Sequence, residues 1–127
     1  MIVYNKAPIE VLWDAVKSLA VTIPIYKEVM DEDENSTPDS YLILRSDVSS
    51  GVEMFGDGSG QIRRSDCDLI LVSKGIAGNA TSTHNTNKAS IAEALEAADI
   101  PYDGYNLGYD ATLKSTEYTF SVTIFYR

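Results

Sequence analysis

Residues 116–126 carry the clearest hydrophobic pattern in the chain. Aromatic and branched apolar side chains alternate there with Glu, Thr and Ser, and this period of two is typical of a β-strand with one buried face. Residues 61–73 predict a longer strand, which begins with charged residues and ends in an apolar run. Because most strands hold about five or six residues, this one must project beyond a small core or bend at a bulge. We expect the two strands to pair in antiparallel orientation.

Two segments, 5–20 and about 81–98, show helical spacing instead. Their apolar residues recur every three or four positions, so each segment has one face that can be buried. We expect Asn5 to cap the first helix, with Pro8 in its first turn, where the missing N–H costs nothing. Trp13 lies on the apolar face of this helix and is expected to anchor the core.

The remaining strand patterns are short. They cover residues 23–30, 41–48 and 102–110. Pro24 places the first of them at a sheet edge or at a strand start. Because several strands follow one another without a helix between them, we expect a mainly antiparallel or mixed sheet. The predicted fold class is α+β, with four to five strands and two helices packed on one face. One domain is expected to span residues 1–127.

Two long loops interrupt the predicted sheet, at about 31–40 and 49–60. The first is an exposed acidic loop, and because its spacing is not that of an EF-hand, a cation site is the less favoured interpretation. Four glycines argue against regular structure in the second loop. Its apolar residues nevertheless favour a docking segment over a disordered linker. The glycine run 56–60 leads into a strand rather than a Lys and a helix, so it does not predict phosphate binding.

Composition narrows the classes of partner. Of 127 residues, 19 are acidic and 10 basic, which gives a formal net charge of −9 and argues against binding to nucleic-acid phosphates. The single cysteine, Cys67, is expected to be a small buried hydrophobe in a reducing compartment. We expect no signal peptide, and no membrane contact, because the apolar runs are shorter than the roughly 20 residues of a membrane helix.

Residues that could carry catalysis do not form a recognised pattern. A nucleophile elbow, zinc-ligand spacing, a P-loop and a Rossmann fingerprint are all missing. Asp66 and Asp68 share one strand face close to two arginines, which favours an interface or cross-strand ion pair over a catalytic or metal site. The lone His84 is expected to be solvated or to cap a helix. We therefore expect no enzyme activity, no catalytic residue, no metal and no cofactor.

The order of these elements resembles the tail-completion and tail-terminator proteins of long-tailed bacteriophages and prophages, which act in head–tail joining. The resemblance covers nearly the whole chain. It rests on an N-terminal helix, an acidic proline-containing loop, an Ala-rich second helix and a set of short motifs: Ile25-Tyr26, Tyr41-Leu42-Ile43-Leu44, Ile62-Arg63-Arg64 through Asp68-Leu69-Ile70-Leu71-Val72-Ser73-Lys74-Gly75, Asp110-Ala111-Thr112-Leu113 and the strand from Tyr118 to Tyr126.

The resemblance implies a non-enzymatic virion protein that assembles in the host cytoplasm into a ring, commonly a hexamer. Such a ring caps the completed tail tube and meets the head connector, so its partners are its own copies, the major tail tube protein and the connector or head-completion protein. Genomic DNA passes through the lumen without specific binding. The alternatives are another neck or tail component, namely a head-completion or tube-like protein, and a small host α+β ligand-binding domain or enzyme. The candidate interface residues are Val52, Glu53, Met54, Phe55, Asp57, Arg63, Arg64, Asp66, Asp31, Glu32, Asp33 and Glu34.

Overall fold

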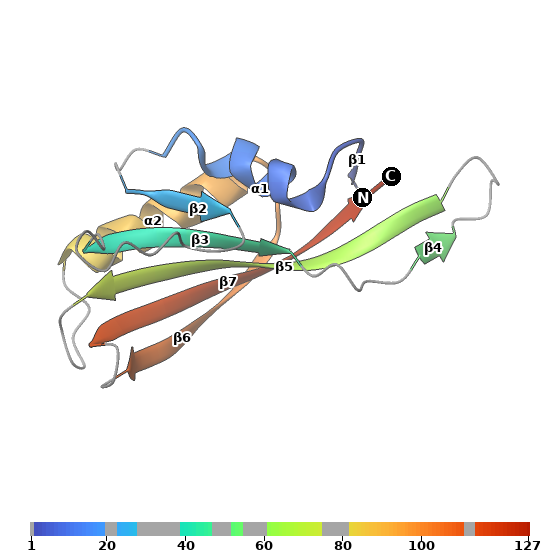
Figure 1. The fold of residues 1–127 in the computed structure, drawn as a ribbon. Coiled ribbons are helices and arrows are strands. Elements are labelled where there is room, and N and C mark those ends of the chain that lie inside the picture. Colours follow the sequence, from blue (N-terminus) through green and yellow to red (C-terminus); the bar gives the residue numbers. More distant parts are fainter. Residues whose placement is uncertain are drawn as a thin grey trace.

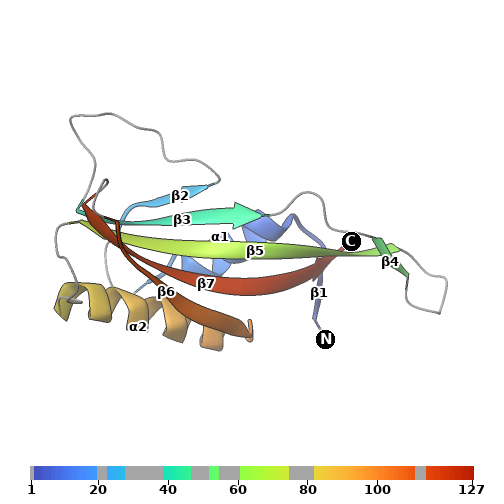
Figure 2. The same cartoon turned by 90° about the horizontal axis from the view of Figure 1, so that it is seen from below.

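The computed structural model describes residues 2–19, 23–27, 39–46, 52–54, 61–74, 82–110 and 114–127. In this part of the chain seven strands form one mixed sheet, and two helices lie on the same face of it (Figures 1 and 2). The predicted α+β class is confirmed. The sheet has more strands than the four to five expected, because two short strands, β1 and β4, show no period in the sequence.

The elements follow in the order β1 (Val3–Tyr4), α1 (Pro8–Val16), β2 (Ile25–Lys27), β3 (Ser40–Ser46), β4 (Val52–Met54), β5 (Gln61–Lys74), α2 (Ser82–Ala97), β6 (Tyr102–Asp110) and β7 (Ser115–Tyr126). In space the strands run β1-β7-β5-β3-β2, with β4 paired to β5 and β6 paired to β7. The pairs β1–β7 and β2–β3 are parallel, and the others are antiparallel. Strand β2 is an edge strand, as Pro24 predicted.

The centre of the sheet is the long pair β5–β7. Its antiparallel register runs without a shift from Arg63 opposite Tyr126 to Lys74 opposite Ser115. The predicted pairing is therefore confirmed, and β5 keeps its length without a bulge in this ladder. Because side chains alternate across a strand, one face of β5 turns towards the helices while the next residue turns away.

The hydrophobic core lies between the helices and that inner face. Strand residues Leu44, Leu69 and Phe120 lie side by side across β3, β5 and β7 and are almost fully buried. Leu12 of α1 and Leu95 of α2 close the core from the other side, each with no exposed surface. Cys67 is also buried, at 1% exposure, as its position in the strand predicted.

Helix α1 is shorter than the segment 5–20 that the periodicity suggested. It begins at Pro8, which occupies the first turn, and ends at Val16. Ala7 is the N-cap residue and makes no side-chain capping hydrogen bond, so the predicted cap at Asn5 is wrong. A proline at the first helical position is already set to the helical φ angle and needs no N–H partner, which explains a start without a polar cap.

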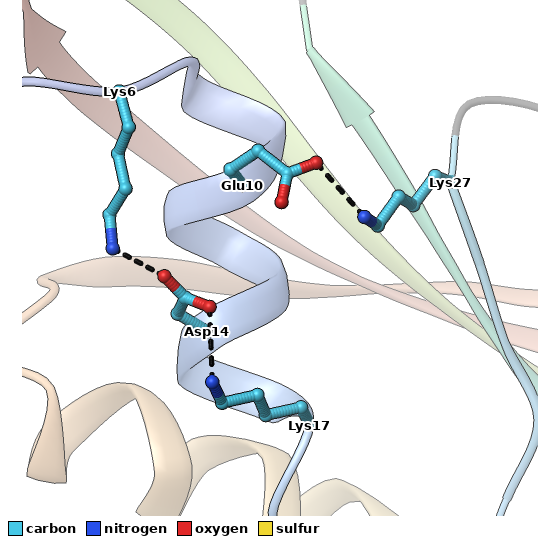
Figure 3. Close-up of polar contacts among 5 residues, drawn as sticks. All are labelled: Lys6, Glu10, Asp14, Lys17 and Lys27. Carbon is cyan, nitrogen blue, oxygen red and sulfur yellow. Dashed lines mark hydrogen bonds and ion pairs between the residues drawn. The ribbon is translucent and has the colours of Figure 1, made fainter.

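Charged side chains join α1 to its surroundings (Figure 3). Lys27 of β2 donates to Glu10 at 2.9 Å, and its ammonium lies 4.8 Å from the centre of the Trp13 ring, so the edge strand is tied to the helix. Lys6 and Lys17 both donate to Asp14, and these hydrogen bonds lower the pKa of that carboxyl. All these groups are well exposed, so the ion pairs orient the helix more than they stabilise it.

Close packing between β6 and β7 depends on a glycine. A Cβ at Gly104 would overlap the Tyr118 hydroxyl group, so any other residue there would displace that ring. Tyr118 packs edge-on against Phe120, with ring centres 5.0 Å apart. The ammonium of Lys88 in α2 lies over the Tyr118 ring, 4.5 Å from its centre. The glycine thus allows an aromatic side chain to link the edge strand, the core and α2.

Thr119 lies on the face of β7 opposite the core, and its replacement by valine is expected to stabilise the protein. Its side chain is 2% exposed, and its hydroxyl has no hydrogen-bond partner among the described residues. Because an unpaired buried hydroxyl is costly, Thr119→Val is expected to raise the free energy of unfolding by about 0.5–2 kcal/mol, measured by urea denaturation. Thr123→Val is the matched control, since that exposed hydroxyl donates to Asp66 at 3.1 Å and should give no gain. A less stable Thr119→Val protein contradicts the prediction.

Candidate functional site

The beginning of β5 projects beyond the helices and forms a two-stranded β-arm with β4 (Figure 1). We define the β-arm as Val52–Met54 together with residues 61–64. Met54 lies opposite Gln61 and Val52 opposite Arg63. The ladder with β7 reaches only as far as Arg63, so within the described residues the tip of β5 pairs with β4 alone.

The β-arm corrects the expectation that residues 49–60 lack regular structure, which is wrong at 52–54. The pairing of β3 with β5 ends where Ser46 lies opposite Cys67. Beyond that point this edge of β5 offers free backbone donors and acceptors, and a returning chain satisfies them by pairing. The glycine content of a segment does not show that a neighbouring strand has unpaired backbone groups with which the segment can pair.

The two arginines of the β-arm behave differently. Side chains of Arg63 and Arg64 are both exposed, and they turn to opposite faces because they are neighbours in a strand. Arg64 forms an ion pair with Asp66 at 3.2 Å, and Asp66 also accepts from Thr123 at 3.1 Å. This ion pair lies within β5, so it is not the cross-strand pair that was predicted for Asp66. Asp68 lies further along the same face of β5, opposite Arg45 and Ser121 in the two neighbouring strands.

Several predicted interface residues lie outside the described residues, namely Phe55, Asp57, Asp31, Glu32, Asp33 and Glu34. For Val52, Glu53 and Met54 the structure gives the strand and its register. Within the described ranges, no group of three or more His, Cys, Asp or Glu side chains is placed to hold a metal ion.

An exposed edge strand was missed by sequence reasoning as part of the interface. Tyr105, Leu107 and Tyr109 of β6 are exposed by 46%, 55% and 37%, and with Ile2 they make up the exposed large hydrophobic residues of the described chain. Strand β6 pairs with β7 on one side, and a free edge of this kind can pair with another chain. The alternation of Tyr, Leu and Tyr was visible in the sequence, but its place at an edge was not.

A groove of about 570 Å³ opens along the edge of β7, between β1 and β6. Strand β6 stops pairing where Tyr102 lies opposite Val122, and β1 begins where Val3 lies opposite Phe125. The part of β7 between these points has no strand beside it on this edge in the described structure. We call this feature the β7-edge groove.

The lining of the β7-edge groove is mainly apolar and aromatic, and its charged residues are all acidic. Apolar surface comes from β1, β7 and the turn after α2, and includes Tyr4, Ile100 and Phe125. Asp99 and Asp103 supply two carboxylates, while no Lys or Arg is among the described lining residues. Such a groove suits an occupant that combines apolar surface with a positive charge.

His84 lies in the first turn of α2 and is only 3% exposed, so the expectation of a solvated side chain is wrong. Its Nδ1 lies 2.6 Å from the hydroxyl of Ser73 at the end of β5. Burial, and next the positive charge of Lys88, lower the pKa of His84. Because both members of the pair are buried, we interpret it as a contact that joins β5 to α2 and not as a nucleophile with its base.

Helix α2 buries more of its surface than its apolar residues indicate. Asn87 and Ser90 follow His84 on the buried side, ahead of Ile91 and Leu95. Polar residues therefore continue the buried stripe towards the N-terminus of the helix. Their type predicted a solvated first turn, and only their helical spacing relative to the apolar stripe could have indicated burial.

Neither helix of the described chain is long and apolar enough to cross a membrane. The β-arm, the exposed β6 edge and the β7-edge groove are the features on which a functional proposal can rest. No protein-family model matches the sequence, and no curated protein matches it.

Proposed function

We propose that the chain is a non-enzymatic structural protein of a phage virion that caps the completed tail tube and meets the head connector as a ring. The β-arm carries this proposal, because a hairpin that extends beyond the core contributes little to a monomer. At the opposite edge of the sheet, no strand of the described chain pairs with the outer side of β6, which carries three exposed large hydrophobic residues. Closed cyclic assembly would cover both surfaces and leave no open strand for uncontrolled growth.

The resemblance in the order of elements supports the same proposal. The N-terminal helix, the strand ending in Ser73-Lys74, the Ala-rich α2 and the final strand β7 occur in the order expected for tail-completion proteins. A net charge of −9 suits a ring through which DNA passes, since like charge prevents adhesion to the lumen. The partners in this proposal are other copies of the chain, the tail tube protein and the connector protein.

The test uses the purified chain and tubes assembled from the tail tube protein of the same phage. Negative-stain microscopy is expected to show added density at one end of each tube, and capped tubes should stop growing when more tube protein is added. The control replaces Val52–Ile62 by a short turn, which removes most of the β-arm. Binding along the whole tube, or no binding at all, contradicts the proposal. Tubes formed by this chain alone would support a tube-like protein instead.

A further inference from the structure

We propose that the β7-edge groove of one copy receives the β-arm of a second copy, with Arg63 of the β-arm lying against Asp99 and Asp103. This inference names the subunit contact of the proposed ring, and it rests on the proposed function for the closure of the copies into that ring. Charge complementarity and the projection of the β-arm both favour this occupant.

The groove presents unpaired negative charge beside apolar surface. No Lys or Arg in the described chain lies within ion-pair distance of Asp99 or Asp103. Helix α2 ends at Ala97, two residues before Asp99, and the partial negative charge of a helix C-terminus adds to that of the carboxylates. Tyr4 and Phe125 supply aromatic surface beside this charge. A guanidinium suits such a place, because it pairs with carboxylates and stacks on aromatic rings.

The basic residues of the chain leave few candidates for the matching charge. Of its 10 Lys and Arg residues, several already interact within the chain: Lys6 and Lys17 with Asp14, Lys27 with Glu10, Arg64 with Asp66, and Lys88 with the Tyr118 ring. Arg63 is exposed, forms no ion pair in the described structure and belongs to the β-arm, which projects beyond the helices. It is therefore the cation best placed to reach another copy.

The net negative charge of the chain affects how two copies can bind each other. Two copies that each carry −9 repel one another at long range, so a stable contact must place opposite charges together. Within one chain, Arg63 and the groove belong to different strands, β5 on one side and the far edge of β7 on the other. The contact is heterologous, with the β-arm of each copy facing the groove of the next, and contacts of this kind generate rings when the rotation closes.

Sedimentation equilibrium of the full chain at low ionic strength tests the contact by exchanging charges. Arg63→Glu and Asp103→Lys are each expected to weaken self-association at least about tenfold, because like charges then face each other. The double variant carries both changes and restores an opposite pair, so its association is expected to return to nearly the wild-type level. Far-ultraviolet circular dichroism establishes that every variant is folded.

Matched controls change the net charge by the same amount elsewhere. Lys114→Glu, on the turn before β7, and Glu93→Lys, on α2, are exposed and should leave self-association close to that of the wild type. The inference is overturned if the wild-type chain stays monomeric at every concentration, if the controls weaken association as much as the single variants, or if the double variant is not restored.

The outcomes for the contact and for the function are separable. If the wild-type chain associates through this charge pair but never binds tube ends, the proposed contact stands and the proposed function is wrong. If the wild type and Arg63→Glu cap tubes equally well and self-associate to the same extent, the proposed function stands and the proposed contact is wrong.

Discussion

Leu69→Ala is expected to lower the free energy of unfolding by about 2–5 kcal/mol. Leu69 has no exposed surface and lies between Leu44 on β3 and Phe120 on β7. The backbone of β5 is held by neighbouring strands on both sides, so it cannot move inward to fill the space that the truncation leaves. The lost hydrophobic transfer free energy and the cost of the remaining cavity therefore both lower the free energy of unfolding.

Ile70→Ala is the matched control, one residue further along the same strand. Ile70 turns to the other face of the sheet, opposite Ile43 and Thr119, and is only half-buried. We expect its truncation to cost roughly 1 kcal/mol. Urea denaturation followed by the fluorescence of Trp13 measures both variants. Equal losses for the two would mean that the face covered by the helices is not the main core.

Mild acid is expected to destabilise the protein through His84. The folded chain lowers the pKa of this imidazole below the ordinary value of 6.5, chiefly by burial. Between the lowered pKa and 6.5 the unfolded chain binds a proton that the folded chain does not, so the free energy of unfolding falls as the pH falls below 6.5. Stability from this group is fully present above 6.5.

His84→Gln isolates that contribution. Glutamine keeps a polar group near Ser73 but does not titrate, so this variant should lose less stability than the wild type as the pH falls below 6.5. Urea denaturation at several pH values, all above the range in which most carboxylates titrate, gives the two slopes. If the slopes are the same, His84 is not the group responsible.

Long periodic segments were predictable from the sequence. Strands β5 and β7, their antiparallel pairing and both helices follow from runs of more than eight residues in which one period dominates. Burial of Cys67 follows from its place within such a run. In these segments the local pattern and the tertiary environment agree, which is the condition under which a pattern is informative.

Features formed between distant segments were not predictable. Strands β1 and β4 hold two and three residues, and each exists because a neighbouring strand offers free hydrogen-bonding groups. His84 is buried because of the way α2 lies on the sheet, a tertiary effect that overrides the usual preference of its residue type. The β7-edge groove needs β1, β6 and β7 together, and these come from both ends of the chain.

The unbroken β5–β7 ladder has a consequence for how the chain folds. Residues from the middle of the sequence pair with the last strand, so the sheet cannot close until that strand has left the ribosome. Contacts between such distant segments make folding slow, because a long loop must be ordered before any pairing compensates for it. Until then the apolar edge of β5 is open to other chains. Synthesis of the final strand is therefore the step that commits each copy to its native structure.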